Sequence, residues 1–476
     1  MGRVIALTLA ELAEIAGGAL HLPEGGPEGG PERDQVVDGS VETDSRLVTS
    51  GSVFFALRGD ETDGHLFAGS AVESGAAVVV AERRLDLPVP VVVVDDGVVA
   101  LSRLAAGVVE RVRRGGRLRV VGVTGSNGKT STKNMLRAVL SDVGPTVAPE
   151  GSFNNHVGAP ISMLRVDLDT EYLVVEMGAS GPGEIARLVE IARPDTGVVL
   201  KVGLAHAGGF GGIEGTRAAK AEMVTDLPET ATAVLNVDDD RVAGMAADTA
   251  ARVVGFGLTD SAAYRATDLE VTRSGTSFVL EHDGVSRPVS LRILGELHVM
   301  NALGALAVAG VWGLDLDRAV QVLEGVARAE RWRMEVLEAG DGVTIVNDAY
   351  NASPDSVAAA LKTLAQIVPE GGRSVAVLGE MAELGDLARE EHDRVGRLVV
   401  RLNVGQLVVV GHEARHIHVA AGLEGSWDGE SVLVDTVDEA YDLLRGTLRD
   451  GDVVLVKSSK SAGLRHLGDR LAGVTA

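Results

Sequence analysis

The segment VVGVTGSNGKTSTKNML, residues 120–136, brings glycines, a lysine and a hydroxyl side chain together at a spacing that can bind phosphate. Its apolar start predicts a buried strand, and the pattern after Lys129 predicts a helix. Gly125 and Gly128 let the backbone turn so that successive N–H groups face an anion, to which the helix adds its positive N-terminal end. Lys129 would reach the outer phosphates of a nucleotide, and the Thr130 hydroxyl would bind Mg²⁺.

The spacing of this loop differs from the common form G-x-x-x-x-G-K-S/T, because Val123 holds the first glycine position and Gly122 lies one residue earlier. The alternative is a glycine-rich turn with an incidental lysine, which the flanking strand and helix make the weaker interpretation. Lysines are scarce, seven in 476 residues, so a lysine here is informative. The candidate nucleotide-binding residues are Gly125, Ser126, Asn127, Gly128, Lys129, Thr130 and Ser131.

A magnesium-nucleotide site also needs an acid at the end of a neighbouring strand. Glu176 ends the apolar run YLVVE, so we expect it at the carboxyl edge of the sheet, where ligands of such sheets bind. His206 follows the next strand in the glycine-rich loop VGLAHAGGFGG. The alternatives are that Glu176 is a solvated strand-end carboxylate and that His206 is a surface or structural residue.

Parallel strands are needed to bring these side chains to one edge. Apolar runs recur after residue 120 with helix-like segments between them, which is the rhythm of a parallel sheet. Between Tyr264 and Leu294 a period-two alternation predicts an antiparallel extension, and a helix is expected from Asn301 to near Gly313. The predicted central strands are YLVVE (172–176), GVVLKV (197–202) and TAVLN (232–236). The predicted C-terminal strands are VTIVND (343–348), SVAVLG (374–379), QLVVVG (406–411), SVLVD (431–435) and DVVLVK (452–457).

The length of the chain, 476 residues at about 150 per domain, favours three domains. We predict an α/β protein with three parts. They are a mixed α/β N-terminal domain (1–115), a central P-loop domain with a parallel sheet (116–328) and a C-terminal Rossmann-like, doubly wound domain (329–476).

The composition excludes several classes of function. The formal charge is 44 − 68 = −24, which argues against nucleic acid or an anionic membrane as the main partner. The absence of cysteine excludes disulfides and thiolate chemistry. The longest uncharged apolar stretch is shorter than the roughly 18 residues that a membrane span needs. The run from Thr8 to Glu11 is typical of a helix capping box rather than of a signal peptide, so we expect a cytoplasmic protein.

Several motifs in the same order resemble the Mur ligase family. They are TGSNGKTS, EMGA from Glu176, AHxxxFG from Ala205, AAKAEM around Lys220 and NVDD from Asn236. Members of this family are three-domain, ATP-dependent enzymes that form amide bonds in peptidoglycan precursors. The resemblance implies that a substrate carboxylate attacks the γ-phosphate of ATP and that an amine then displaces phosphate from the resulting acyl phosphate.

The resemblance assigns roles to the residues of the nucleotide site. Catalysis would rest on Lys129, Glu176, His206 and Lys220. Thr130 and Glu176 would hold one Mg²⁺, and His206 with a carbamylated Lys220 would hold a second. The alternative for Lys220 is an ordinary helix lysine paired with Glu222 or Asp226.

Three more residues are implied to contact ATP, and the chain departs from the family pattern beside two of them. Asn301 would contact the adenine, Asp348 the ribose and Arg333 the phosphates. Leu297 stands where the family usually has histidine, and Trp332 stands where it has the glycine before Arg333. A third departure is Gly208, at a position where glutamate is common.

Further segments resemble the branch of the family that adds a dipeptide. They are the uridine-nucleotide-binding segment 43–76, SFNNHVGAP (152–160), PGEI (182–185) and NDAYNASPDS (347–356). The resemblance implies two small-molecule substrates, UDP-N-acetylmuramoyl-tripeptide (UDP-MurNAc-tripeptide) and D-Ala-D-Ala, and a monomer. The candidate substrate-binding residues are Thr43, Asp44, Ser45 and Arg46 for the uridine nucleotide, Asn154 and Asn155 for the muramoyl-tripeptide, and Tyr350, Asn351, Lys457 and Ser459 in the C-terminal domain.

Alternatives remain open at this point. Asn154 and Asn155 could form a structural turn, and Asp63 and His65 could stabilise the N-terminal domain. The chain could be the ligase that adds the third residue to the dipeptide precursor, although it lacks the DNPR run of the diaminopimelate-adding enzyme. A folate-polyglutamylating ligase would leave the uridine-type domain without a role. A nucleotide-dependent switch of the GTP type would need an NKxD segment, which does not occur.

Overall fold

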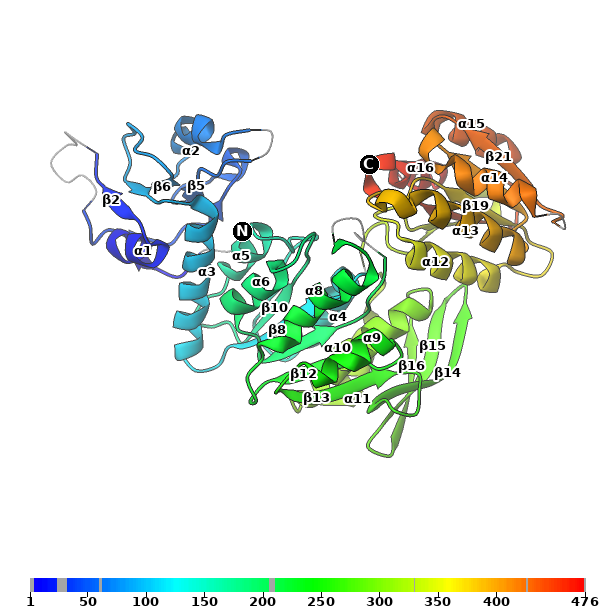
Figure 1. Ribbon diagram of the computed structural model, residues 1–476, viewed down its shortest axis with the longest axis horizontal. Coiled ribbons are helices and arrows are strands. Elements are labelled where there is room, and N and C mark those ends of the chain that lie inside the picture. Colours follow the sequence, from blue (N-terminus) through cyan, green and yellow to red (C-terminus); the bar gives the residue numbers. More distant parts are fainter. Residues whose placement is uncertain are drawn as a thin grey trace.

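In the part of the chain that the structure describes, three large sheets, each with its own helices, mark three α/β domains, as predicted (Figure 1). The computed structural model describes residues 4–23, 32–59, 62–204, 210–328, 330–424 and 427–474. The N-terminal and C-terminal domains, blue and yellow to red in Figure 1, lie on opposite sides of the green central domain. The boundaries 115/116 and 328/329 stay predictions.

The N-terminal domain has a five-stranded sheet of order β2-β7-β6-β5-β4 and a two-stranded sheet of β1 and β3. The predicted capping box is present: the Thr8 side chain accepts from the Glu11 N–H, and the Glu11 carboxylate accepts from the Thr8 N–H at 2.9 Å. The elements are β1 (Leu7–Thr8), α1 (Leu9–Ala16), β2 (Ala19–His21), β3 (Val36–Val37), β4 (Val41–Glu42), η1 (Ser45–Leu47), β5 (Val53–Phe55), η2 (Gly64–Phe67), α2 (Ala68–Glu73), β6 (Val78–Ala81) and β7 (Val91–Val93).

One long helix, α3 (Gly97–Arg114), connects the N-terminal and central sheets. It packs against α1 on the N-terminal side and against α5 (Gly158–Met163) and α6 (Glu184–Ala192) on the central side. Its buried residues join one apolar cluster that includes residues of both domains. The N-terminal domain is therefore attached to the central domain through a shared core.

The central domain has a nine-stranded sheet of order β16-β15-β14-β13-β12-β11-β8-β10-β9. Neighbouring strands from β9 to β14 are parallel, and β15 and β16 form the predicted antiparallel extension. The remaining elements are β8 (Arg119–Thr124), α4 (Lys129–Ser141), β9 (Thr146–Val147), β10 (Tyr172–Glu176), β11 (Thr196–Val199), α8 (Ile213–Thr225), β12 (Thr232–Asn236), α9 (Asp240–Ala243), η3 (Gly244–Ala247), β13 (Arg252–Gly257), β14 (Tyr264–Thr272), β15 (Gly275–His282), β16 (Val285–Leu291), α10 (Glu296–Val311) and α11 (Leu316–Gly325).

Two predicted boundaries in this domain were wrong. The strand predicted over 197–202 ends at Val199, because the chain beyond it turns to the phosphate loop, where the Lys201 carbonyl accepts from the Ser126 N–H at 2.8 Å. The helix predicted to begin at Asn301 begins at Glu296, directly after Gly295, whose φ of 102° ends the extended chain.

The C-terminal domain has a six-stranded sheet of order β17-β18-β22-β19-β20-β21, which is parallel except for the edge strand β17. All five predicted strands are present, whereas β17 was not predicted. The elements are β17 (Glu335–Glu338), η4 (Gly340–Gly342), β18 (Thr344–Asn347), α12 (Pro354–Ile367), β19 (Ser374–Leu378), η5 (Gly385–Leu387), α13 (Ala388–Arg401), β20 (Gln406–Val410), η6 (His412–Ala414), α14 (Arg415–Leu423), β21 (Glu430–Val434), α15 (Val437–Thr447), β22 (Val453–Lys457), η7 (Lys460–Ala462) and α16 (Leu464–Leu471). Within the described residues, no helix has the length and apolar character needed to cross a bilayer.

Candidate active site

The predicted phosphate loop connects β8 to the N-terminus of α4. Gly125 and Gly128 have φ values of 150° and 88°, backbone conformations that residues with a Cβ rarely adopt. A Cβ on Gly128 would also collide with Oδ1 of Asn301. Gly122 lies within β8 and faces the methionines of the core, where a Cβ would come 3.1 Å from Met177 Cε. The shifted first glycine therefore serves packing, and the loop keeps both glycines that its geometry requires.

We predict that Gly128→Ala destabilises the fold by about 2–4 kcal/mol, since strain at positive φ adds to a clash with a buried amide. Gly116→Ala is the matched control: its φ is 107°, and among the described atoms a Cβ there would meet nothing within 4 Å. The control should lose only about 1 kcal/mol. Urea denaturation of both variants measures the difference. Equal losses would mean that Asn301 does not restrict the loop.

Lys129 lies at the wall of a cavity of about 670 Å³ between the central and C-terminal domains. Its Nζ donates to the Gly125 carbonyl at 2.6 Å. Burial lowers the pKa of Lys129, the negative charge of Glu176 opposes this shift, and the positive charge of Arg333 adds to it. An anion in the cavity would compensate the buried ammonium, which suits a phosphate-binding lysine.

Glu176, at the end of β10, lies opposite Val123 of β8 in the parallel register. Its side chain is buried, so the alternative of a solvated carboxylate is wrong. Oε1 accepts from Thr130 Oγ1 at 3.2 Å and from Asn154 Nδ2 at 2.8 Å. Oε2 is buried and has no hydrogen-bond partner among the described residues. An unpaired buried carboxylate oxygen beside a hydroxyl is a donor set that fits Mg²⁺.

The described residues contain no group of three or more histidine and carboxylate side chains that could hold a metal ion unaided. This is compatible with Mg²⁺, which commonly takes one or two protein ligands and completes its shell with phosphate oxygens and water. The predicted ligand His206 and the departure at Gly208 lie outside the described residues.

Lys220 on α8 is buried, and its Nζ lies 5.3 Å from the centroid of the Phe210 ring. Burial, with a further contribution from the charge of Lys129, lowers the pKa of Lys220 to about 7. The Glu222 carboxylate, proposed above as an alternative partner, accepts from the backbone N–H groups of Gly183 at 2.7 Å and Ala186 at 3.0 Å. A buried lysine that is about half neutral at pH 7 and mostly neutral above it is chemically suited to carbamylation.

Sequence reasoning missed Lys133, one turn after Lys129 on α4. Lys133 is fully buried, and its Nζ donates to the carbonyls of Pro149 and Gly151 at 2.9 Å each. It thereby holds the loop that carries Ser152 and Asn154 against the site. Its spacing of four residues from Lys129, in a chain with few lysines, was the available signal.

The C-terminal domain closes the other side of the cavity. Arg333 Nη2 donates to Thr130 Oγ1 at 3.2 Å, and the guanidinium carbon lies 4.3 Å from the centroid of the Tyr350 ring. The Tyr350 hydroxyl donates to Ser152 Oγ at 3.1 Å. Ser353 Oγ donates to Asn127 Oδ1, also at 3.1 Å. These contacts bring Arg333 to Thr130 at the phosphate loop and Tyr350 to Ser152. The contact of Arg333 with the ATP phosphates stays a prediction.

Asn301 and His298 lie on α10 at the same cavity, with Leu297. Asn301 Oδ1 accepts from Thr132 Oγ1 at 3.3 Å, and its Nδ2 lies 3.4 Å from His298 Nδ1. Burial, together with the charge of Arg333, lowers the pKa of His298 to about 4, so the ring is neutral at pH 7 and Nδ1 can accept this bond. The contact of Asn301 with adenine stays a prediction.

Other predicted residues of the C-terminal domain already have partners within it. Lys457 Nζ pairs with Asp348 Oδ2 at 2.6 Å and donates to the Asn351 carbonyl at 3.1 Å. Ser459 Oγ accepts from the Ala382 N–H at 2.8 Å. Asp348, Asn351 and Lys457 line the cavity. Their roles toward ribose and dipeptide stay predictions, and Lys457 would have to exchange its partner Asp348 for a substrate carboxylate.

The two neighbouring asparagines have different surroundings. Asn154 lines the cavity and binds Glu176, whereas Asn155 Oδ1 accepts from the N–H groups of Val157 at 3.2 Å and Gly158 at 2.8 Å. Asn155 thus has the turn-forming environment that was left open as an alternative, at the start of α5.

The candidates in the N-terminal domain lie apart from this cavity. The described residues that line the cavity do not include Thr43, Asp44, Ser45 or Arg46. Asp44 pairs with the exposed Arg46 at 2.5 Å. His65 is buried, with Nδ1 at 2.5 Å from Asp63 Oδ1 and Nε2 accepting from the Glu82 N–H at 3.0 Å. Both ring nitrogens of His65 have partners within the domain, which fits a stabilising role.

Comparison with known proteins agrees with this arrangement. Three family models match: "Mur ligase family, catalytic domain" over residues 39–110, "Mur ligase middle domain" over 123–309 and "Mur ligase, glutamate ligase domain" over 332–460. The UDP-N-acetylmuramoyl-tripeptide–D-alanyl-D-alanine ligase of Mycobacterium bovis is 44% identical over 98% of both chains, and that of Bacillus subtilis is 32% identical over 98% of both.

Solved structures are similar along the whole chain. A crystal structure of MurF from Acinetobacter baumannii superposes with a TM-score of 0.87 at 29% identity and covers 99% of both chains. The MurF ligase of Thermotoga maritima, solved in complex with ADP, has a TM-score of 0.80 at 29% identity over 91% of this chain and 97% of that one. Both the sequence and the arrangement of its three domains show that the chain belongs to the Mur ligase family.

Proposed function

We propose that this chain is an ATP-dependent ligase that joins D-Ala-D-Ala to UDP-MurNAc-tripeptide in the synthesis of peptidoglycan precursors. The relatives that support the proposal are named for this activity, and each aligns with this chain over 98% of both lengths. The observation that carries the proposal is the buried, unpaired Oε2 of Glu176 beside Thr130 and Lys129, since it gives a nucleotide-metal site its acid.

The reaction joins a carboxylate to an amine in two steps. A carboxylate oxygen of the tripeptide attacks the γ-phosphorus of ATP, and the bond from that phosphorus to the β,γ-bridging oxygen breaks, which releases ADP. The amine nitrogen of D-Ala-D-Ala then attacks the carbonyl carbon of the acyl phosphate. The carbon–oxygen bond breaks, phosphate leaves, and the nitrogen loses a proton.

The residues of this chain contribute mainly charge and position to these steps. The ammonium of Lys129 and the guanidinium of Arg333 lie on two domains and point into one cavity, where they would neutralise the charge on the transferred phosphoryl group. The stacking of Arg333 on Tyr350 fixes its direction. Residues of two domains line the cavity. Movement of these domains toward each other would therefore also exclude water from the acyl phosphate.

Magnesium would supply charge neutralisation on the phosphate oxygens. Thr130 and Glu176 would hold one ion, and His206 with a carbamylated Lys220 would hold a second. Glu176 would exchange its bond from Thr130 for the ion, and Asn154 would keep the carboxylate in its orientation.

We predict that Lys220 takes up CO₂ as a carbamate. Its pKa of about 7 lies below the usual value, so the neutral amine that reacts with CO₂ is scarce below pH 7 and predominates above it. Protein equilibrated with ¹³C-bicarbonate at pH 8 should show a carbamate carbon resonance, which should weaken as the pH falls through 7. Lys220→Arg should lose it, and Lys362→Arg, at an exposed lysine on α12, should keep it. An unchanged resonance in Lys220→Arg would contradict the assignment.

The direct test of the function is an incubation of pure protein with ATP, UDP-MurNAc-tripeptide and D-Ala-D-Ala, followed by mass spectrometry of the products. We expect one ADP and one phosphate per ligated pentapeptide, with tripeptides that end in lysine or diaminopimelate tested separately. ADP release that depends on a free lysine or diaminopimelate with the dipeptide precursor would favour the third-residue ligase. Phosphate release at full rate without any acceptor would favour a nucleotide switch.

The proposal extends to the setting of the enzyme. We propose a monomer in the cytoplasm, where ATP and uridine-linked precursors are available, with no nucleic-acid partner and no membrane insertion. The strongly acidic composition supports the exclusion of polyanionic partners.

A further inference from the structure

The backbone around Arg333 has an unusual conformation. The residues on either side of it, Trp332 and Met334, have φ values of 57° and 50°. This left-handed region is unfavourable for residues with a Cβ, and pairs of such residues persist only where surrounding contacts hold them. The strain therefore points to contacts that fix this segment. The Met334 N–H donates to Asp348 Oδ1 at 3.1 Å, and Trp332 makes the other contacts.

The indole of Trp332 is held on several sides by the C-terminal domain. The guanidinium carbons of Arg331 and Arg465 lie 5.1 and 5.4 Å from the centroid of a Trp332 ring. The ring of His466 meets the indole edge-on at 6.1 Å. The backbone N–H of Trp332 donates to Glu335 Oε2 at 3.0 Å. Cation–π attraction stabilises a guanidinium that lies above the face of an indole ring.

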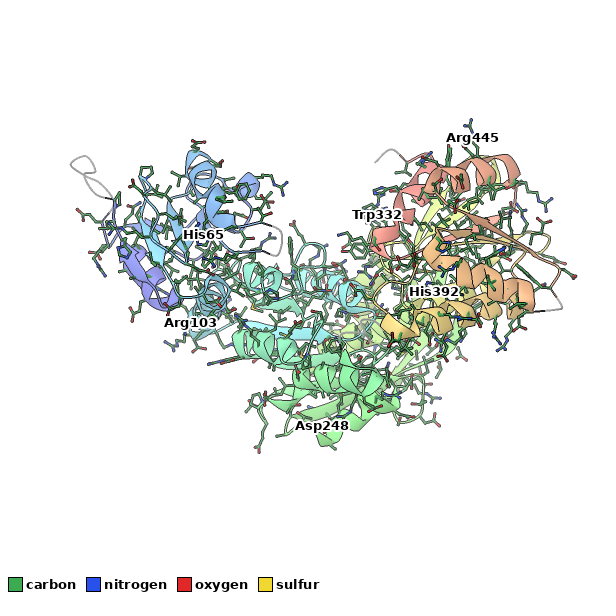
Figure 2. The ribbon with its side chains drawn as sticks, turned by 45° about the horizontal axis from the view of Figure 1, so that its top comes forward. His65, Arg103, Asp248, Trp332, His392 and Arg445 are labelled. Carbon is green, nitrogen blue, oxygen red and sulfur yellow. The ribbon has the colours of Figure 1, made fainter. Side chains whose placement is uncertain are left out.

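A buried carboxylate fixes the polar end of the indole. Trp332 Nε1 donates to Asp469 Oδ2 at 2.9 Å, and Arg331 Nη2 donates to the same oxygen at 2.9 Å. The other oxygen of Asp469 accepts from Asn347 Nδ2 on β18 at 3.1 Å. Asp469 is 2% exposed. The segment that precedes Arg333 is thus tied both to α16 and to the sheet of the C-terminal domain, and Figure 2 shows Trp332 beside that helix.

The next residue reaches the other domain. Arg333 Nη2 donates to Thr130 of the phosphate loop at 3.2 Å, and its buried Nε has no partner within the described part of the chain. Trp332 is therefore the last anchored residue on the N-terminal side of Arg333. Freedom at Trp332 would reach the guanidinium of Arg333, whose other contact within the C-terminal domain is its stacking on Tyr350.

We propose that Trp332 is a positioning residue for Arg333: anchored by Asp469, Arg331 and Arg465, it holds the strained backbone that directs the guanidinium at the phosphates of ATP. This role rests on the proposed function, because it supposes that ATP occupies the cavity. Its alternative is that Trp332 only packs the C-terminal domain. The two differ in whether the effect of Trp332 depends on Arg333.

Trp332→Gly separates these readings well, since glycine accepts the φ of 57° without strain but makes none of the indole contacts. In the intact chain we expect kcat/KM for ATP to fall by about 30-fold, mostly in kcat if ATP binding energy is used in the transition state. In an Arg333→Ala background the same substitution should change kcat/KM less than about twofold, because coupled residues are not additive. Equal losses in both backgrounds, or no loss in the intact chain, would overturn the proposal.

Two further variants keep the test independent of folding. Trp332→Phe retains a ring for the two arginines and loses the N–H to Asp469. Its kcat/KM should therefore fall about threefold, between the intact chain and Trp332→Gly. Trp427→Phe is the matched control, since its Nε1 donates to the Val404 carbonyl at 2.9 Å in the same domain. It should keep kcat/KM unchanged even if the melting temperature falls. An equal loss of kcat/KM in this control would overturn the proposal.

The outcome of this experiment is separable from that of the proposed function. If the unsubstituted chain does not ligate D-Ala-D-Ala, the proposed function fails. The affinity of the same set of variants for a non-hydrolysable ATP analogue then tests the positioning of Arg333. A coupling between Trp332 and Arg333 in that affinity supports the inference, and independent effects overturn it.

Discussion

Lys129→Met should lower kcat/KM for ATP by about 10³-fold or more, since it removes the ammonium that faces the transferred phosphoryl group in a cavity that excludes much of the solvent. The fold should not weaken. Burial lowers the pKa of Lys129, which means that the folded chain disfavours the charged form, so methionine of similar shape relieves that cost. We therefore expect a melting temperature equal to or above that of the unsubstituted chain, measured without nucleotide.

The control for this substitution is Lys362→Met, at an exposed lysine on α12. It removes the same charge from the chain and should leave kcat/KM for ATP unchanged. Titration calorimetry with ADP should show a weaker affinity for Lys129→Met only. If Lys129→Met ligated at the normal rate, the phosphate loop would not be the site of phosphoryl transfer.

The second large effect is expected at Glu176. Glu176→Gln keeps the size and the bond to Thr130 but removes the negative charge, so we expect kcat/KM to fall by about 10²- to 10³-fold. The Mg²⁺ concentration for half-maximal activity should rise at least about tenfold, because an amide is a weaker ligand than a carboxylate for this ion. Initial rates across a Mg²⁺ series at saturating ATP measure both effects.

A second buried carboxylate provides the comparison. Asp452 is 1% exposed and pairs with Arg373 at 2.6 Å in the C-terminal domain. Asp452→Asn should cost stability and leave the Mg²⁺ requirement unchanged. If the Mg²⁺ requirement were the same in Glu176→Gln and the unsubstituted chain, Glu176 would have no part in holding the ion.

The candidate site of the central domain was predictable because its signals are local. A strand, two glycines and a lysine followed by threonine lie within one short segment, and parallel strands bring their carboxyl ends to one edge. Glu176 needed only the additional expectation that YLVVE is a strand. The alternation of apolar runs likewise predicted all five parallel strands of the C-terminal sheet.

What sequence did not reveal depends on partners far away in the chain. Asp469 and Trp332 are separated by 137 residues, and nothing periodic links them. Lys133 reads as an ordinary helix lysine until its two carbonyl partners are known. The edge strand β17 has the sequence EVLE, and glutamate is not typical of strands. Its pairing with β18, which the sequence does not show, gives it regular structure.

The departures from the family pattern become intelligible in the same way. Trp332 replaces a glycine at a position whose φ is positive, and its cost is offset by contacts that glycine could not make. The departure at Leu297 leaves a histidine one residue later, and that residue, His298, contacts Asn301 within the site.

The helix α3 has a practical consequence for anyone who divides this protein into pieces for expression. One of its sides packs against α1 of the N-terminal domain and another against α5 and α6 of the central domain, within a single apolar cluster. A cut on either side of α3 would expose the apolar surface that α3 covers in one fragment and the apolar side of α3 itself in the other. Both fragments would tend to aggregate. The first two domains are best produced as one polypeptide.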